Sequence, residues 1–311
     1  MDVVQSETTV GVASESWDRV AESEVEVALL GALSALDSVR PLLPTVGTDA
    51  FEAAYPDLFL MRQHLRHPCS RAMRRSLFDR LPALVTKLEV LFDECICASE
   101  QHSVEVLKRL KDQGGLRSGD ISNFLGRLVA PGASLKTLRD EFERLPEVQG
   151  EIRAARINST SHVLVIGCGA LSLSGIGYAL AGARVTLVDH NQQMVSALND
   201  FLKLLPSELS TRITTLHRDG AEPSLWSGEV SHVFLAAMVR SKELFIPLLN
   251  LFFRQSTAGR GARTAIIRNP IENLFSIGYG PFDTLDTLCA SLVEVVDPMD
   301  QTSLSLILRA D

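Results

Sequence analysis

The sequence has few of the residues that build disulfide frameworks and metal centres. It contains five scattered cysteines and no CxxC or HExxH motif. Disulfide frameworks use an even set of cysteines, and zinc sites use closely spaced cysteines or histidines. We therefore expect reduced thiols, a cytoplasmic protein and no metal site built by the chain.

Basic residues are also scarce for a protein that binds nucleic acid. The 30 Lys and Arg residues stand against 38 Asp and Glu residues, which gives a formal net charge of −8. Nucleic-acid binding depends on neutralising phosphates with basic side chains. We expect no nucleic-acid partner and a small-molecule substrate instead, while a homodimer stays open.

The chain lacks a hydrophobic run that suits a membrane. Its most apolar stretch, residues 163–188, contains five glycines and Arg184, whereas a transmembrane helix needs about 20 predominantly apolar residues. The first twenty residues carry four acidic side chains and lack the basic start and apolar run of a signal peptide. We expect no membrane segment, and a mobile tail over residues 1–22.

What the chain does contain divides into two halves. Over residues 23–157 the apolar residues recur at helical spacing, as in Val25, Leu29 and Leu33, and prolines and glycines separate the helical stretches. This half is expected to be an all-helical domain.

From residue 158 onward, short β-branched runs alternate with helical patterns. This alternation predicts βαβ units in a mostly parallel sheet, and hence a Rossmann-like domain over residues 158–311. A short turn before the last run makes that final strand antiparallel. The expected strands are His162–Ile166, Arg184–Val188, Ile213–Leu216, His232–Leu235, Thr264–Ile267, Ser291–Val296 and Leu304–Leu308.

A glycine loop follows the first of these strands. Gly167, Gly169 and Ala170 stand where the chain turns tightly and a ligand can approach the start of a helix. A dinucleotide fingerprint needs a third glycine three residues after Gly169, and Ser172 is there instead. The loop therefore favours a nucleotide-like ligand but weakens the case for NAD or FAD.

Two acidic residues lie at or just after strand ends in the same domain. Asp189 follows the second strand, where its carboxylate can accept hydrogen bonds from both hydroxyl groups of a ribose. This placement suits a nicotinamide cofactor and S-adenosylmethionine (SAM) equally. Asp219, followed by Gly220 after the third strand, can accept from an adenine amino group, as is usual in SAM-dependent enzymes. The alternative for Asp219 is a turn-forming role.

Together these residues resemble the Rossmann-like class I SAM-dependent methyltransferase fold, and within it the nicotianamine synthase family. The stretch GCGALSLSGI, residues 167–176, resembles the family's GSGPLPLTSI loop. The stretch VFLAAMV, residues 233–239 and including Ala236, resembles the family's VFLAALV after the fourth strand. Residues 122–125, SNFL, resemble part of the family's YYxNYLKL segment.

This resemblance implies SAM as a substrate and an uncommon reaction. Members of the family form a C–N bond at the carbon that joins sulfur to the aminobutyrate arm of SAM, and they release 5′-methylthioadenosine. The helical domain is implied to act as a lid that builds the amine site over the sheet.

The sequence departs from the family pattern at one informative place. Asp120 and Ile121 replace the paired tyrosines that the family uses to orient the incoming amine. Azetidine-2-carboxylate synthases, which have similar sequences, need no second substrate, because the α-amine of SAM closes a four-membered ring. We favour this cyclisation; transfer to an amino acid, as in nicotianamine or opine synthesis, is the alternative, and methyl transfer is a more remote one.

Five residues are candidates for catalysis, each with a structural alternative. Asp120 can serve as a base or as a helix cap, and Asn123 can hold the aminobutyrate arm or cap a helix. Glu94 and Glu100 lie on one expected helix and face either the cleft or solvent. Tyr178 can stabilise the sulfonium cation with its ring or pack inside the protein.

Overall fold

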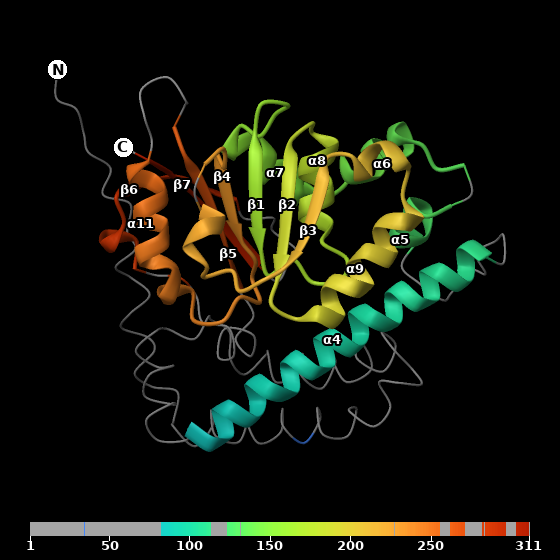
Figure 1. Cartoon of the computed structure of the whole chain (residues 1–311), viewed down its shortest axis with the longest axis horizontal. Helices are drawn as coiled ribbons and strands as arrows, with labels where there is room; N and C mark the ends of the chain where they lie inside the picture. Colours follow the sequence, from blue (N-terminus) through green and yellow to red (C-terminus); the bar gives the residue numbers. More distant parts are fainter. Residues whose placement is uncertain are drawn as a thin grey trace.

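The computed structural model describes Ser34 and residues 82–112, 123–130, 132–226, 228–255, 262–270, 282, 284–296 and 303–310 (Figure 1). The described elements before the sheet are all helices. They are α4 (Pro82–Asp112), α5 (Asn123–Leu128), α6 (Leu135–Phe142) and α7 (Pro146–Ala155). The expected tail, residues 1–22, lies outside the described residues.

A seven-stranded sheet forms the centre of the molecule, with strand order β3-β2-β1-β4-β5-β7-β6. Strands β1 to β5 are parallel, and β7 pairs antiparallel with both β5 and β6. All seven expected strands and the antiparallel last strand are thus confirmed. The strands are β1 (His162–Ile166), β2 (Arg184–Asp189), β3 (Ile213–His217), β4 (His232–Leu235), β5 (Thr264–Pro270), β6 (Ala290–Val296) and β7 (Ser303–Ala310).

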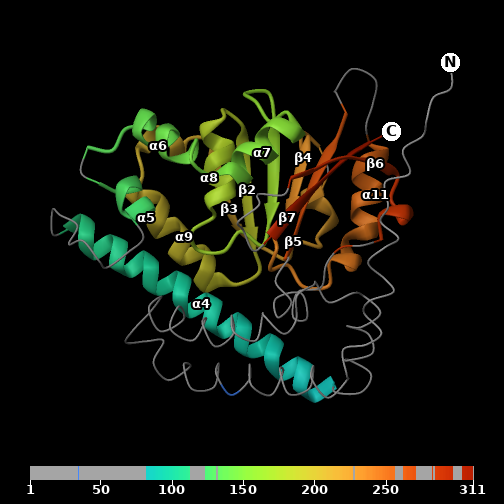
Figure 2. The same cartoon turned by 180° about the vertical axis from the view of Figure 1, so that it is seen from behind.

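Helices cover both faces of this sheet, as the front and back views show (Figures 1 and 2). Helices α7, α8 and α9 pack on one face and α11 on the other. The remaining elements are α8 (Leu173–Leu180), α9 (Gln192–Leu204), α10 (Ser207–Ser210), η2 (Pro223–Trp226), η3 (Lys242–Phe245), α11 (Ile246–Arg254) and η4 (Leu285–Thr287).

Side-chain alternation along the strands explains the two hydrophobic cores. In β1, Val163 and Val165 join the core under α7 to α9, whereas Leu164 and Ile166 join the core under α11. Because both faces are covered, the strand reads as an unbroken apolar run rather than as an alternating one. Helices α5 to α7 share the first core with the sheet; the division at residue 157 stays a prediction.

A buried network of charged and polar groups joins α7 and α8 to the far half of the sheet. Glu151, on α7, has no exposed surface. It accepts hydrogen bonds from the Tyr178 hydroxyl at 2.7 Å, from Nη2 of Arg268 at 2.8 Å and from the Ser305 hydroxyl at 2.5 Å. Arg268 also pairs with Glu147 at 2.9 Å. The network therefore fixes α7 and α8 against β5 and β7.

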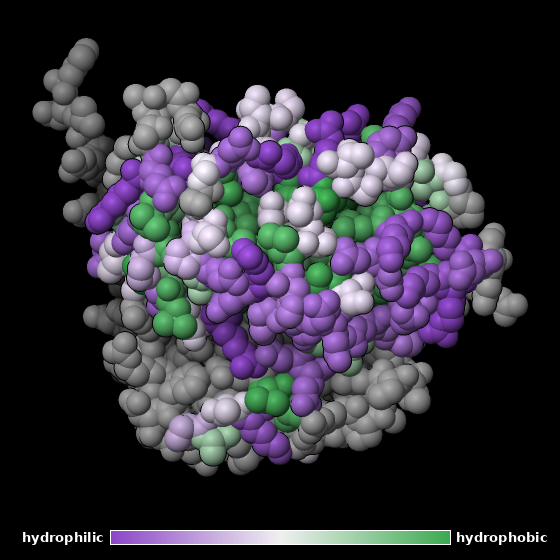
Figure 3. Space-filling view, viewed as in Figure 1, coloured by the Kyte–Doolittle hydropathy of each residue, from purple (hydrophilic) through white to green (hydrophobic). Residues whose placement is uncertain are grey.

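Helix α4 crosses the edge of the sheet where β1, β2 and β4 end, and it lies alongside α9 (Figures 1 and 2). Hydrophilic residues cover this region of the surface (Figure 3). The polar contacts of α4 include Gln101 with Gln193 (3.3 Å), Lys108 with Asp200 (2.8 Å), Lys111 with the Leu204 carbonyl (2.7 Å), and Asp93 with Arg240 beyond β4. Helix α4 therefore bridges the two sides of this edge.

Among the residues that the structure describes, no helix combines the length and apolar character needed to span a membrane.

Candidate functional site

The glycine loop lies between β1 and α8, as the sequence predicted. Gly167 and Gly169 adopt φ angles of 73° and 62°, a region in which glycine is the default residue. The N–H groups of Gly167 and Cys168 donate to the Val188 carbonyl at 2.9 and 3.2 Å. These bonds hold the loop against the end of β2, so that the following N–H groups point towards the carboxyl edge of the sheet.

Asp189, at the end of β2, is bound to this loop. Its Oδ2 accepts from the Gly169 N–H at 3.0 Å, and its Oδ1 accepts from the Asn191 N–H at 2.9 Å. The residue is buried, with 8% of its surface exposed. Each carboxylate oxygen can accept more than one hydrogen bond. Asp189 is therefore held in one orientation and keeps capacity to accept from a ligand hydroxyl group.

Glu100 reaches the same loop from helix α4. Its Oε2 accepts from the Ala170 N–H at 2.5 Å. A methyl group on Gly169 would lie 2.6 Å from Oε2 and 2.9 Å from Oε1 of Glu100, so residue 169 has no room for a side chain. Burial, together with the negative charge of Asp189, raises the pKa of Glu100 to about 7 although the Ala170 bond opposes the shift. Near neutral pH this carboxylate can both accept and release a proton.

Two thiols lie beside these carboxylates. Burial and the charges of Glu100, Asp93 and Asp189 raise the pKa of Cys97, on α4, to about 11. The pKa of Cys168, in the loop, is also raised, chiefly by burial. Because the thiolate is the reactive form, both groups are inert near neutral pH.

The loop after β4 forms the neighbouring wall of the site. The Ala236 N–H donates to the Ile166 carbonyl at 3.1 Å, and a methyl group on Gly167 would lie 2.6 Å from Cγ2 of Val239. Ala236 thus lies beside the glycine loop, as the sequence predicted. Its role in binding a ligand stays a prediction.

Asp219 and Gly220 follow β3 at the same edge. Asp219 is exposed, and its Oδ1 accepts a hydrogen bond from the Ala221 N–H at 2.9 Å. This is the geometry of a turn-forming aspartate, which is the alternative to a role in binding adenine. Its second oxygen takes no part in that bond. Gly220 is needed for close packing, because a methyl group there would lie 2.4 Å from Cγ2 of Ile166.

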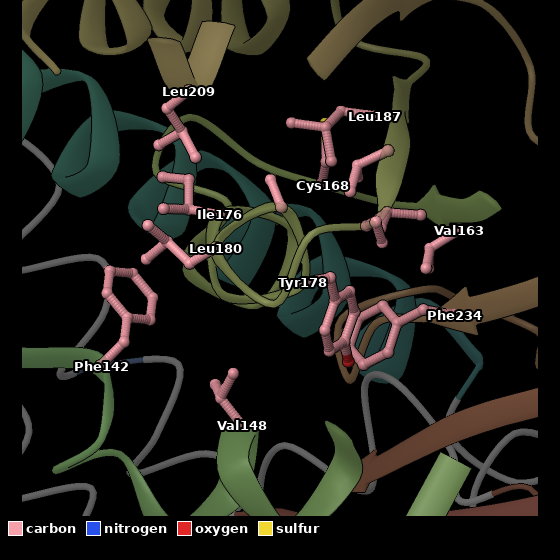
Figure 4. Close-up of a cluster of buried hydrophobic side chains, with 14 of the residues drawn as sticks. Phe142, Val148, Val163, Cys168, Ile176, Tyr178, Leu180, Leu187, Leu209 and Phe234 are labelled. Atoms are coloured by element: carbon pink, nitrogen blue, oxygen red, sulfur yellow. The ribbon is translucent and has the colours of Figure 1, made fainter. Parts of the chain in front are cut away.

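The other catalytic candidates are not brought to the loop. Tyr178 is fully buried, packs edge-on against Phe234 and donates to Glu151 (Figure 4), so its contacts are those of the packing alternative. Glu94 is half-buried on α4 and lies about 120° around the helix from Glu100. Asp120 lies outside the described residues. Asn123 begins α5, and its role stays a prediction.

Sequence reasoning missed two features of the site. One is the ion pair of Asp93 with Arg240, which ties α4 to the loop after β4. The other is the left-handed conformation of Ser172, with φ of 38°, at the position of the third fingerprint glycine; that substitution itself was the available signal. Within the described part of the chain, no group of three or more His, Cys, Asp or Glu side chains is placed to hold a metal ion.

Comparison with known proteins places this geometry in a fold class. No protein-family profile matches the chain, and no curated protein matches its sequence. Its structure is similar to that of MtNAS, a nicotianamine synthase, in complex with MTA and tNA: the TM-score is 0.60 at 13% identity, over 92% of this chain and 98% of that chain. A glutamate-to-glutamine variant of MtNAS gives a TM-score of 0.57 at 13% identity, over 92% of this chain and 97% of that chain. The chain therefore has the Rossmann-like class I SAM-dependent methyltransferase fold that the sequence predicted.

Proposed function

We propose that this protein uses SAM as a substrate and forms a C–N bond at the carbon that joins sulfur to the aminobutyrate arm, releasing 5′-methylthioadenosine. In the form we favour, the α-amine of SAM attacks that carbon and closes azetidine-2-carboxylic acid. The likeness of the fold to a nicotianamine synthase that was crystallised with MTA supports C–N bond formation with release of methylthioadenosine. The preference for cyclisation rests on Asp120 and Ile121, which stand where the family has paired tyrosines.

The observation that carries the proposal is the Glu100 carboxylate on the glycine loop. The α-amine of SAM, with an unperturbed pKa of ~7.7–8.0, must lose a proton before its nitrogen can attack. A general base works best when its own pKa lies near the working pH, and burial raises the pKa of Glu100 to about 7. Glu100 also lies within hydrogen-bonding distance of the loop that would hold the aminobutyrate arm.

The reaction balances with this single base. Glu100 accepts one proton from the ammonium group, and the neutral nitrogen then attacks the carbon attached to sulfur. The new C–N bond takes the nitrogen lone pair, and the electrons of the breaking C–S bond neutralise the sulfonium. Methylthioadenosine leaves, and Glu100 passes its proton to solvent. Helix α4 then contributes by positioning the base and by excluding water from the amine.

The products test this proposal directly. Purified enzyme given SAM alone at pH ~8 is expected to form methylthioadenosine and azetidine-2-carboxylate in equal amounts, because each ring closure releases one methylthioadenosine. Positioning of the intramolecular amine can contribute up to ~7–11 kcal/mol towards lowering the barrier. Mass spectrometry identifies both products. A reaction without enzyme measures spontaneous breakdown of SAM.

Other products would select other chemistry. Methylthioadenosine formed only after addition of an amino acid would favour intermolecular transfer. Homoserine lactone as the partner product would mean that the carboxylate attacked. S-adenosylhomocysteine formed instead of methylthioadenosine would exclude the proposed reaction and favour a methyltransferase.

The Asp189→Ala substitution is expected to weaken SAM binding by about 10- to 150-fold, because a charge-assisted hydrogen bond to a buried ribose contributes ~1.5–3 kcal/mol. Titration calorimetry measures the dissociation constant. The matched control is Asp140→Ala, which removes an exposed carboxylate on α6 and should leave affinity unchanged. Equal affinities for the two variants would remove Asp189 from the binding site.

A further inference from the structure

Helix α4 is held on both sides of the glycine loop where it crosses the edge of the sheet (Figures 1 and 2). The strand before that loop, β1, lies between β2 and β4. On the β2 side, side chains of α4 bind α9, as in the pair of Lys108 with Asp200 at 2.8 Å. On the β4 side, the Asp93 carboxylate pairs with Arg240. Glu100 meets the glycine loop between these two supports.

The geometry of α4 shows why both supports matter. Asp93 and Glu100 are seven residues apart, which is about two turns, so they share one face of the helix. About 12 Å of helix separates Glu100 from Lys108, so a rotation of about 10° around the α9 contacts would move Glu100 by about 2 Å. A hydrogen bond does not survive such a displacement. The ion pair on the β4 side is therefore placed to prevent this rotation.

The support on the β4 side is itself fixed. Lys242 has no exposed surface, and its ammonium group donates to the Ala237 and Val239 carbonyls at 2.7 and 3.1 Å. A buried charge is costly unless it is hydrogen-bonded, so these bonds hold the short turn after β4 in one shape. In that turn Val239 packs against Gly167. The backbone of Arg240, the next residue, is thus fixed relative to the glycine loop.

We propose that Arg240 is a positioning residue, which keeps α4 docked through Asp93 and so keeps Glu100 on the glycine loop. This inference rests on the proposed function, in which Glu100 is the base, and it adds the group that places that base. Both members of the pair are partly exposed, and such pairs contribute little to global stability. Loss of the pair should therefore change the site more than it changes the stability of the fold.

The protonation of Glu100 reports whether α4 is docked. Burial is the main cause of its raised pKa of about 7, the charge of Asp189 on β2 adds to the shift, and the Ala170 bond opposes it. The thiols of Cys97 on α4 and Cys168 in the loop have raised pKa values and stay neutral in this range. When α4 rotates away, water reaches Glu100, and its pKa should fall towards the ordinary ~4.3.

The combined substitution of Asp93→Asn and Arg240→Met removes the pair without leaving an unpaired charge. The probe is the amide resonance of Ala170 in a 1H–15N spectrum of the free protein, followed from pH 5 to 8.5. In the wild-type protein this resonance should shift with a midpoint of about 7, following Glu100. In the double variant the midpoint should fall by at least about one pH unit. The reversed pair, Asp93→Arg with Arg240→Asp, should restore it.

The matched control removes an ion pair of the same kind at the opposite edge of the sheet. Arg184, where β2 begins, pairs with Glu229, so Arg184→Met with Glu229→Gln should keep the wild-type midpoint. Release of methylthioadenosine provides a second measurement. In the variant without the Asp93 pair, kcat should fall by about 10- to 100-fold, because a misplacement of about 1 Å can cost 100-fold. The control should keep the wild-type kcat.

An unchanged midpoint in the double variant would overturn the positioning role, and so would a reversed pair that does not restore the midpoint. If the double variant does not fold, Asp93→Asn alone weakens the same pair with one neutral substitution, and its midpoint should lie below that of the wild type. An unchanged midpoint there would overturn the role equally. Failure of the wild-type protein to release methylthioadenosine would refute only the proposed function, because the Ala170 titration is measured without substrate.

Discussion

Glu100→Gln is expected to lower kcat by about 10²- to 10⁴-fold, the usual contribution of a positioned general base. Glutamine can still accept from the Ala170 N–H but cannot take a proton from the α-amine. In the wild-type enzyme, kcat/KM should rise with pH through about 7, as Glu100 loses its proton. In the variant the rise should move to the pKa of the substrate amine, ~7.7–8.0. Methylthioadenosine release against pH measures both effects.

The control for this experiment lies on the same helix. Glu105 is exposed and pairs with Lys108 at 2.9 Å, so Glu105→Gln should keep kcat within about twofold, given the small effect of exposed pairs. Binding of methylthioadenosine, which lacks the α-amine of SAM, checks that the site of Glu100→Gln is intact. A variant that keeps both the wild-type rate and the wild-type pH profile would place the base elsewhere.

Arg268→Met is expected to destabilise the protein by about 3–5 kcal/mol, because removal of one partner leaves buried charge uncompensated. Arg268 is the cation that pairs with Glu147 and Glu151 beneath α7. Burial raises the pKa of Glu147, and Arg268 opposes that shift, so loss of Arg268 raises this pKa further and favours the neutral form of Glu147 in the variant. The deficit relative to wild type should therefore be smaller at pH 5 than at pH 8. Urea unfolding at the two pH values measures both the size and the direction of the effect.

An exposed pair provides the comparison. Arg218 and Glu222 are 3.4 Å apart and roughly half exposed, so Arg218→Met should cost less than about 1 kcal/mol. If Arg268→Met does not fold, Arg268→Lys keeps the charge but loses the forked geometry, and an intermediate cost is expected. Equal costs for the two Met variants would show that the network contributes little to stability.

The sheet could be predicted from the sequence because its signals are local. Strands such as His162–Ile166 are short β-branched runs bounded by turns. The ends of β1 and β4 agree with the predicted ones, and the other five strands extend one to three residues beyond a predicted end. The positions of Gly167, Gly169 and Asp189 followed from the same pattern, since a glycine loop and an acidic strand end occupy fixed places in a βαβ unit.

The part of the site that comes from α4 could not be predicted in this way. Glu94 and Glu100 are the same residue type on one helix, and helical periodicity shows only that they face different directions. Which of them meets the loop depends on how α4 lies across the sheet, and that depends on distant pairs such as Lys108 with Asp200. For Tyr178 the residue type allowed two roles, and the ring was considered as a partner for the sulfonium cation of SAM. In the structure its hydroxyl group donates instead to the buried Glu151 carboxylate.

The separation between α4 and its partners along the chain has a consequence for synthesis. Glu100 meets a residue 70 positions later, and the bonds from Gln101, Lys108 and Lys111 reach residues 92 or 93 positions later. During translation α4 therefore leaves the ribosome well before β1 to α9, the surface on which it packs. Contacts between distant segments form slowly, so α4 docks only after that surface has been made and folded. Until then Glu100 has no Ala170 N–H group to meet, so the glycine loop and the proposed base come together only in that docking step.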